Sequence, residues 1–175
     1  MATYQQLFNL CKKKFNISWL YGQSHANEKL FLTEKAKQYP TLCVGFLNII
    51  HPDRLHIIGP AEIEFFNQIS HDARVGFLQK LVENKSLGLV VCLDLALPDD
   101  MIQPLIDTNL PVFGTSEPPE KVLTFVRHNI VKLLAPSCSM HGVFMDVFGM
   151  GILLSGQSGI GKSELGLELV TRGHG

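Results

Sequence analysis

One glycine-rich octapeptide constrains this chain more than any other feature. Residues 156–163 read Gly-Gln-Ser-Gly-Ile-Gly-Lys-Ser and match G-x-x-x-x-G-K-[ST], the pattern of a loop that binds phosphate through its backbone. An apolar run over residues 151–155 precedes the octapeptide and predicts a short buried strand, and Leu165 and Leu169 follow at helical spacing. The order strand, glycine loop, helix distinguishes a phosphate-binding loop from a chance string.

The chemistry of phosphate binding explains each residue type in the loop. Glycines let successive backbone N–H groups point at a phosphate, and the following helix start adds unsatisfied N–H groups and a positive dipole end. Lys162 can reach the β- and γ-phosphates of a nucleotide, and the Ser163 hydroxyl can bind Mg²⁺. The flanking elements argue against a glycine turn that only caps a core helix. The predicted nucleotide-binding residues are Gly156, Gln157, Ser158, Gly159, Ile160, Gly161, Lys162 and Ser163, with Ser163 as metal ligand.

Composition excludes several classes of partner. The 175 residues allow one buried core, or one domain with part of another, and the net charge of −1 argues against nucleic acid or an acidic membrane as partner. No apolar run approaches the roughly 18 residues of a membrane span, and no signal-peptide core is present at the N-terminus. The cysteines are far apart in the sequence and form no C-x-x-C motif. We therefore predict a cytoplasmic protein in which all four are free thiols: Cys11, Cys43, Cys92 and Cys138.

Helical and strand patterns alternate in the chain before the loop. Helices are predicted over residues 4–15, near 34–37, after Pro60, over 71–83, and from 98 to just before Asn109. Strands are predicted over residues 41–46, 54–59, 87–93 and 110–114. The uninterrupted apolar run 87–93 is typical of a central parallel strand. This alternation predicts an α/β domain with a mainly parallel sheet.

A boundary is predicted at residues 116–120, where two prolines occur together. A connector helix at about 118–134 then joins a first domain, 1–134, to a second, 135–175. Strands are predicted over 140–147 and 150–155, with Gly149 and Gly151 at the turn between them. His51, His56 and His71 are scattered through the first domain, and we interpret them as ordinary polar or partly buried side chains.

Residues 137–175 resemble the start of the catalytic domain of HPr kinase/phosphorylase. The resemblance runs from Met140 through His141 and the glycine loop to the final segment Leu-Glu-Leu-Val-Thr-Arg-Gly-His-Gly. Segments 54–59, 87–93 and 110–113 are more loosely similar to that family's N-terminal domain. The resemblance implies a kinase fold around the loop similar to that of phosphoenolpyruvate carboxykinase.

The resemblance also implies an activity. Members are bacterial, cytoplasmic, homohexameric enzymes that use ATP and Mg²⁺ to phosphorylate a serine of HPr, the phosphocarrier of the sugar phosphotransferase system. They also remove that phosphate by phosphorolysis, with inorganic phosphate and pyrophosphate as further small partners. By this resemblance Lys162 is catalytic, and His141, 21 residues earlier, takes the place of the active-site histidine. A Cys138–His141 metal pair is the alternative role for that histidine, and it lacks two further ligands.

Two alternatives stay open on the residues alone. The family's general base is an aspartate in an acidic pair that follows the Arg-Gly-His segment, and the sequence to Gly175 contains no such pair. We therefore expect a fragment that is inactive by itself: a first domain and the nucleotide-binding start of a kinase domain. The alternatives are a regulatory module whose loop senses a nucleotide or phosphate without transferring anything, and a small-molecule kinase.

Overall fold

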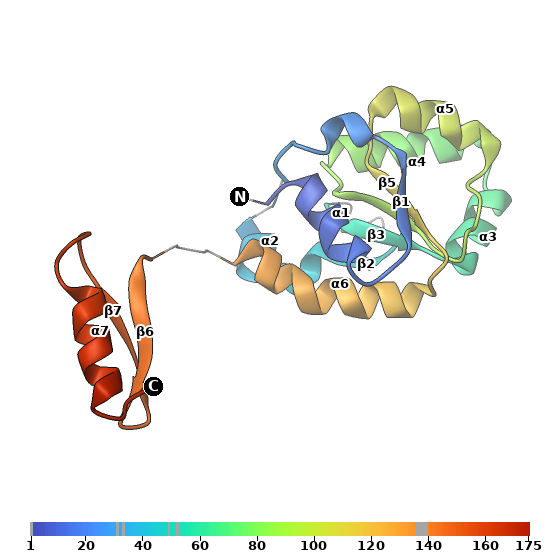
Figure 1. Ribbon diagram of the computed structural model, residues 1–175. Coiled ribbons are helices and arrows are strands. Elements are labelled where there is room, and N and C mark those ends of the chain that lie inside the picture. Colours follow the sequence, from blue (N-terminus) through green and yellow to red (C-terminus); the bar gives the residue numbers. More distant parts are fainter. Residues whose placement is uncertain (1, 31, 33, 49, 52, 136–139) are drawn as a thin grey trace. The chain divides into compact units, whose positions relative to one another are not determined.

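The computed structural model describes residues 2–30, 32, 34–48, 50–51, 53–135 and 140–175 (Figure 1). The chain divides into two compact units, Met1–Ala135 and Pro136–Gly175. Among the helices that the structure describes, none combines the length and apolarity needed to cross a bilayer.

The first unit is built on a five-stranded sheet in the order β1-β5-β4-β3-β2. Four neighbouring strands run parallel to one another, and β1 pairs antiparallel with β5 at one edge. The mainly parallel α/β sheet predicted from the alternating pattern is confirmed. The strands are β1 (Ile17–Tyr21), β2 (Val44–Phe46), β3 (Leu55–Ile58), β4 (Gly88–Val91) and β5 (Val112–Thr115).

Helices cover both faces of this sheet, which explains why its central strands are apolar throughout. One core packs α1 (Tyr4–Lys12) and α6 (Pro119–Leu134) on side chains that include Ile57 and Phe113. The other core packs three helices on side chains that include Ile58 and Val112. Successive strand residues thus enter opposite cores. The three helices of the second core are α3 (Pro60–Gln68), α4 (His71–Glu83) and α5 (Asp99–Thr108).

Short elements connect the first helix to the parallel strands. They are η1 (Gln23–His25), α2 (Glu34–Gln38) and η2 (Pro40–Cys43). The strand predicted over residues 41–46 therefore begins only at Val44, because η2 occupies its first part and Pro40, at the first position of that turn, is preset for helical geometry.

The structure places α6 inside the first unit, Met1–Ala135. Val122, Val126 and Ile130 on this helix are fully buried against the sheet. Because these side chains complete one of the two cores, α6 is part of the first unit's core and not merely a link to the next unit.

The described cysteines behave as small hydrophobic side chains, as expected from their apolar surroundings. Cys11 and Cys92 are free and buried, and Cys43 is buried. Burial raises the pKa of Cys11 to about 12, of Cys43 to about 11 and of Cys92 to about 12. These thiols are therefore poor nucleophiles at neutral pH, because the reactive thiolate is scarcely populated. Cys138 lies outside the described residues.

The second unit is a hairpin with one helix packed on it. Strands β6 (Gly142–Val147) and β7 (Met150–Ser155) pair antiparallel, and α7 (Lys162–Thr171) packs through Gly166 on Val143. The turn differs from the predicted one: it consists of Phe148 and Gly149, both with positive φ (55° and 77°), as in a tight two-residue hairpin turn.

The second strand of this hairpin is more exposed than predicted. Gly151 lies within β7 opposite Asp146, not at the turn, and the strand expected to be buried has exposed positions along its length. One helix can cover only one face of the hairpin, so Phe144 on the other face is 73% exposed.

Candidate functional site

The glycine loop connects β7 to α7, the context that its sequence predicts. Gly159 and Gly161 have φ values of 82° and 91°, in the left-handed region where a side chain would be strained. Gly161 is the residue that immediately precedes α7, and its carbonyl accepts the N–H of Leu165 at 2.9 Å. The N–H groups of the first turn of α7 have no partner within the helix, so they face the loop as donors for an anion.

Lys162 lies across the loop. Its ammonium donates to the carbonyl oxygen of Gly156 at 2.9 Å and to that of Gln157 at 2.5 Å. These two contacts place the positive charge at the mouth of the loop. A phosphate bound there would gain an ammonium partner without a large rearrangement of the side chain.

A cavity of about 630 Å³ opens above the loop and brings most of the predicted site residues together. Gln157 and Ile160 do not line it: Gln157 contributes its carbonyl to Lys162, and Ile160 is 69% exposed. Glu164, which sequence reasoning did not select, does line it. The lining residues are His141, Gly156, Ser158, Gly159, Gly161, Lys162, Ser163 and Glu164.

His141 reaches this cavity through the pairing of the hairpin. Gly142, the next residue, lies opposite Ser155 in the β6–β7 register, and Ser155 is followed by the first glycine of the loop. The imidazole and the loop are therefore neighbours in space although they are far apart along the chain. The pairing register of the hairpin therefore explains why His141 lies near the loop.

The cavity fits the phosphates of a magnesium nucleotide. Backbone N–H groups, an ammonium and an imidazole are suited to phosphoryl oxygens. Magnesium at such sites takes most of its ligands from phosphates and water, so the Ser163 hydroxyl is a fitting protein ligand, with Glu164 beside it. Among the residues that the structure describes, no group of three or more His, Cys, Asp or Glu side chains forms a separate metal site.

Comparison with known families matches both units. The family described as HPr Serine kinase N terminus matches residues 4–130, and the one described as HPr Serine kinase C-terminal domain matches residues 132–175. This chain belongs to the HPr serine kinase family. The resemblance inferred from residues 137–175 is thereby confirmed, and it extends over the first unit.

Several relatives in the HPr serine kinase family have comparable sequence identity to this chain. An HPr kinase/phosphorylase of Paraburkholderia phymatum is 36% identical over 173 residues, which cover 98% of this chain and 53% of the relative. Another, of Burkholderia ambifaria, is 35% identical with the same coverage. A third, of Xylella fastidiosa, is 29% identical over 98% of this chain and 54% of the relative. The chain spans about half the length of the curated relatives it matches.

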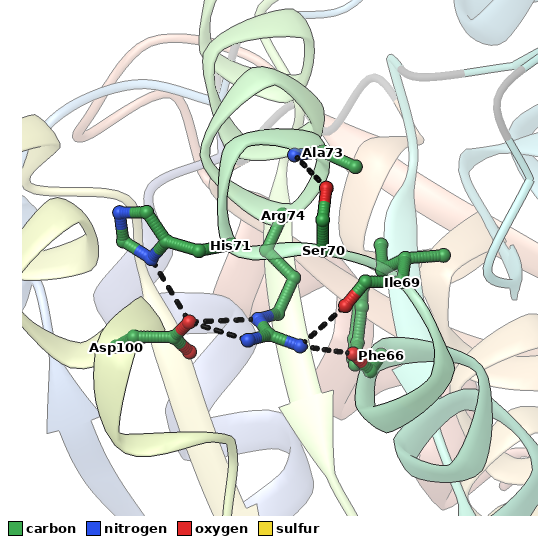
Figure 2. Close-up of polar contacts among 7 residues, drawn as sticks. All are labelled: Phe66, Ile69, Ser70, His71, Ala73, Arg74 and Asp100. Atoms are coloured by element: carbon green, nitrogen blue, oxygen red, sulfur yellow. Dashed lines mark hydrogen bonds and ion pairs between the residues drawn. The ribbon is translucent and has the colours of Figure 1, made fainter.

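The first unit of this family member has a second polar cluster, centred on Arg74 (Figure 2). Its guanidinium donates to Asp100 Oδ2 from Nε at 2.9 Å and from Nη2 at 2.5 Å. Nη1 donates to the carbonyl oxygens of Phe66 and Ile69 at 2.6 and 2.7 Å. His71 Nδ1 lies 2.9 Å from the same Asp100 oxygen. The cluster joins the end of α3 to the first turn of α5, which is a structural role.

The Arg74 cluster predicts an acid-dependent contribution to stability. Hydrogen bonds from Arg74, and then from His71, lower the pKa of Asp100. The contribution of the ionised Asp100 to the free energy of unfolding is therefore complete above the pKa of an aspartate in the unfolded chain, about 3.9. It is lost as the pH falls through the lower pKa that Asp100 has in the folded state. We expect Asp100→Asn to reduce the free energy of unfolding at pH 7, with a smaller difference from wild type at pH 3. Urea unfolding at the two pH values measures this, and a pH-independent difference would contradict it.

Proposed function

We propose that the complete protein containing this chain is a bifunctional HPr serine kinase/phosphorylase. It transfers a phosphoryl group from ATP, with Mg²⁺, to a serine of the phosphocarrier HPr. It also removes the phosphoryl group from the serine of HPr by transferring it to inorganic phosphate, which yields pyrophosphate. The observation that carries the proposal is that His141, Lys162 and the glycine loop line one cavity in a member of this family.

The roles of the residues follow from their positions. Gly156–Ser163 bind the phosphates through backbone N–H groups, and Lys162 neutralises charge that develops on the transferring group. Ser163, next to Lys162, contributes to the magnesium site. His141, which also lines the cavity, would hydrogen-bond a phosphoryl oxygen. When bound, the magnesium nucleotide supplies the phosphoryl group that is transferred.

The remaining properties are proposed for the complete protein in the same way. It acts in the bacterial cytoplasm, in carbon-catabolite regulation by the phosphotransferase system, and it assembles as a homohexamer. Its partners are HPr, inorganic phosphate and pyrophosphate. The support for each of these is membership of the HPr serine kinase family, to which the curated relatives named HPr kinase/phosphorylase also belong.

Two assays with the complete protein test the proposal. With γ-labelled ATP, HPr and Mg²⁺, the expected result is label on a serine of HPr, lost when the Mg²⁺ is chelated. With serine-phosphorylated HPr and inorganic phosphate, the expected product is pyrophosphate. A protein that binds ATP in calorimetry but labels no HPr would contradict the kinase proposal, and it would favour the alternative of a nucleotide- or phosphate-sensing module.

A further inference from the structure

A cavity of about 440 Å³ opens in the first unit, at the side of the sheet where the parallel strands β2 and β3 end. The segment after β2, the first two turns of α3, and α4 contribute residues to its wall, among them Leu47, Asn48, Glu62, Phe65 and Phe77. Ligands of open α/β sheets bind outside the carboxyl ends of the strands. The volume also lies within the range of small-molecule sites, roughly 300–1,000 Å³.

Most of the cavity wall is apolar. Phe77 is only 7% exposed, and its ring centroid lies 5.7 Å from that of Phe66 in the core formed with α3, α4 and α5. Leu47 packs against the same core. Phe65 is 40% exposed, although it is a large aromatic side chain. A half-exposed ring beside a buried one forms a surface on which the apolar part of a ligand can pack.

Glu62 gives the cavity its charge. Its Oε2 accepts the N–H of Gly59 at 2.9 Å, which fixes the carboxylate at the start of α3. Within the described part of the chain, Glu62 has no ion-pair partner. Asn48, the other polar residue in the described wall, accepts the N–H of Ile50 through Oδ1 at 2.8 Å. The carboxylate therefore remains available to a cationic donor on a ligand.

A second carboxylate adds to the negative charge at this end of the sheet. Burial raises the pKa of the Cys92 thiol to about 12, and Glu120 and then Glu62 contribute to that rise. Both carboxylates are thus close enough to act on the residue that follows β4. Glu120, too, lacks an ion-pair partner among the residues that the structure describes. Two such carboxylates disfavour an anionic ligand and favour a cationic one.

We propose that this cavity binds a small amine with an apolar body, of the size of an arylalkyl amine. The ammonium group donates to Glu62, and the apolar body packs against Phe65 and Phe77. Burial of the apolar body supplies affinity, and the carboxylate selects the amine over an alcohol or an acid of the same shape. The site goes beyond the proposed phosphoryl transfer and uses none of the residues of the glycine loop, so failure of HPr phosphorylation would leave it unaffected.

Three probes of matched shape test the charge requirement: phenethylamine, phenethyl alcohol and hydrocinnamate. Each is titrated at pH 7 and constant ionic strength into the ¹⁵N-labelled 175-residue chain, and the amide resonances of Ala61 and Phe65 are followed. The expected result is a saturable shift with the amine, and binding about three- to tenfold weaker for the alcohol and weaker still for the acid. Equal binding of amine and alcohol overturns the proposal, and so does an amine titration that does not saturate.

Variants then locate the site. Glu62→Gln keeps an oxygen for the Gly59 N–H, because glutamine serves as well as glutamate in this cap, and it should abolish the preference for the amine without weakening the alcohol. Phe65→Ala, at a half-exposed position, should weaken amine and alcohol alike by about threefold or more. Glu64→Gln, at an exposed position of the same helix, is the matched control. An amine preference that survives Glu62→Gln, or that Glu64→Gln abolishes as well, contradicts the assigned site.

Discussion

Replacing Lys162 with alanine is expected to lower kcat for HPr phosphorylation by the complete protein on the order of 10²–10³-fold or more, the usual effect of removing one preorganised charge from a transition state. Lys162 lines the cavity, and its ammonium is already held at the mouth of the loop by the carbonyls of Gly156 and Gln157. Among the described residues that line the cavity, Lys162 is the only lysine, and alanine removes its charge. The initial rate of label transfer from ATP to HPr measures the effect.

The same variant should keep its fold. Both hydrogen bonds of the Lys162 side chain are exposed contacts within its own loop, so the midpoint of thermal unfolding should stay close to that of wild type. Lys80→Ala, which removes an exposed lysine from α4, is the control and should retain the wild-type rate. A Lys162→Ala protein with undiminished transfer would show that the loop does not hold the reacting phosphate.

Gly88→Ala is expected to reduce the free energy of unfolding by about 3 kcal/mol or more, through backbone strain combined with a steric clash. Gly88 begins β4 with a φ of 118°, which side chains rarely tolerate, and a Cβ there would lie only 2.3 Å from the Pro111 carbonyl oxygen. That oxygen accepts the N–H of Leu89 at 2.9 Å. Any movement that relieves the clash would therefore disturb the pairing of β4 with β5 at the centre of the sheet.

Gly76→Ala is the matched control. Gly76 lies within α4, and a Cβ added there would meet no atom within 4 Å. Alanine is the better helix former, so this variant should gain about 0.5–1 kcal/mol. Urea unfolding of the two variants, with equal m-values, gives both free energies. Similar stabilities for the two would refute the assigned conformation of Gly88.

Features that depend on contiguous residues could be predicted from the sequence. The helix predicted over 71–83 has those bounds in the structure, and the strand β4 lies within the predicted run 87–93. The glycine loop was predicted because its spacing, its preceding strand and its following helix are all local. The same local match revealed the family.

Features that depend on pairing between distant segments could not be predicted. The strand β1 was missed because its apolar alternation covers only five residues. Its place is set by Trp19, whose ring centroid lies 4.5 Å from that of Phe113 on the neighbouring strand β5. The role of α6 in the core depends likewise on which side chains of the sheet lie beneath it.

The sequence by itself determined the phosphate loop and the α/β class, because residue spacing encodes local backbone geometry, and its resemblance to HPr kinase/phosphorylase indicated the family. Only the tertiary structure placed His141 beside the loop in one cavity. Such neighbours are decided by strand register and by the packing of helices on the sheet, and periodicity along a single chain carries no information about either.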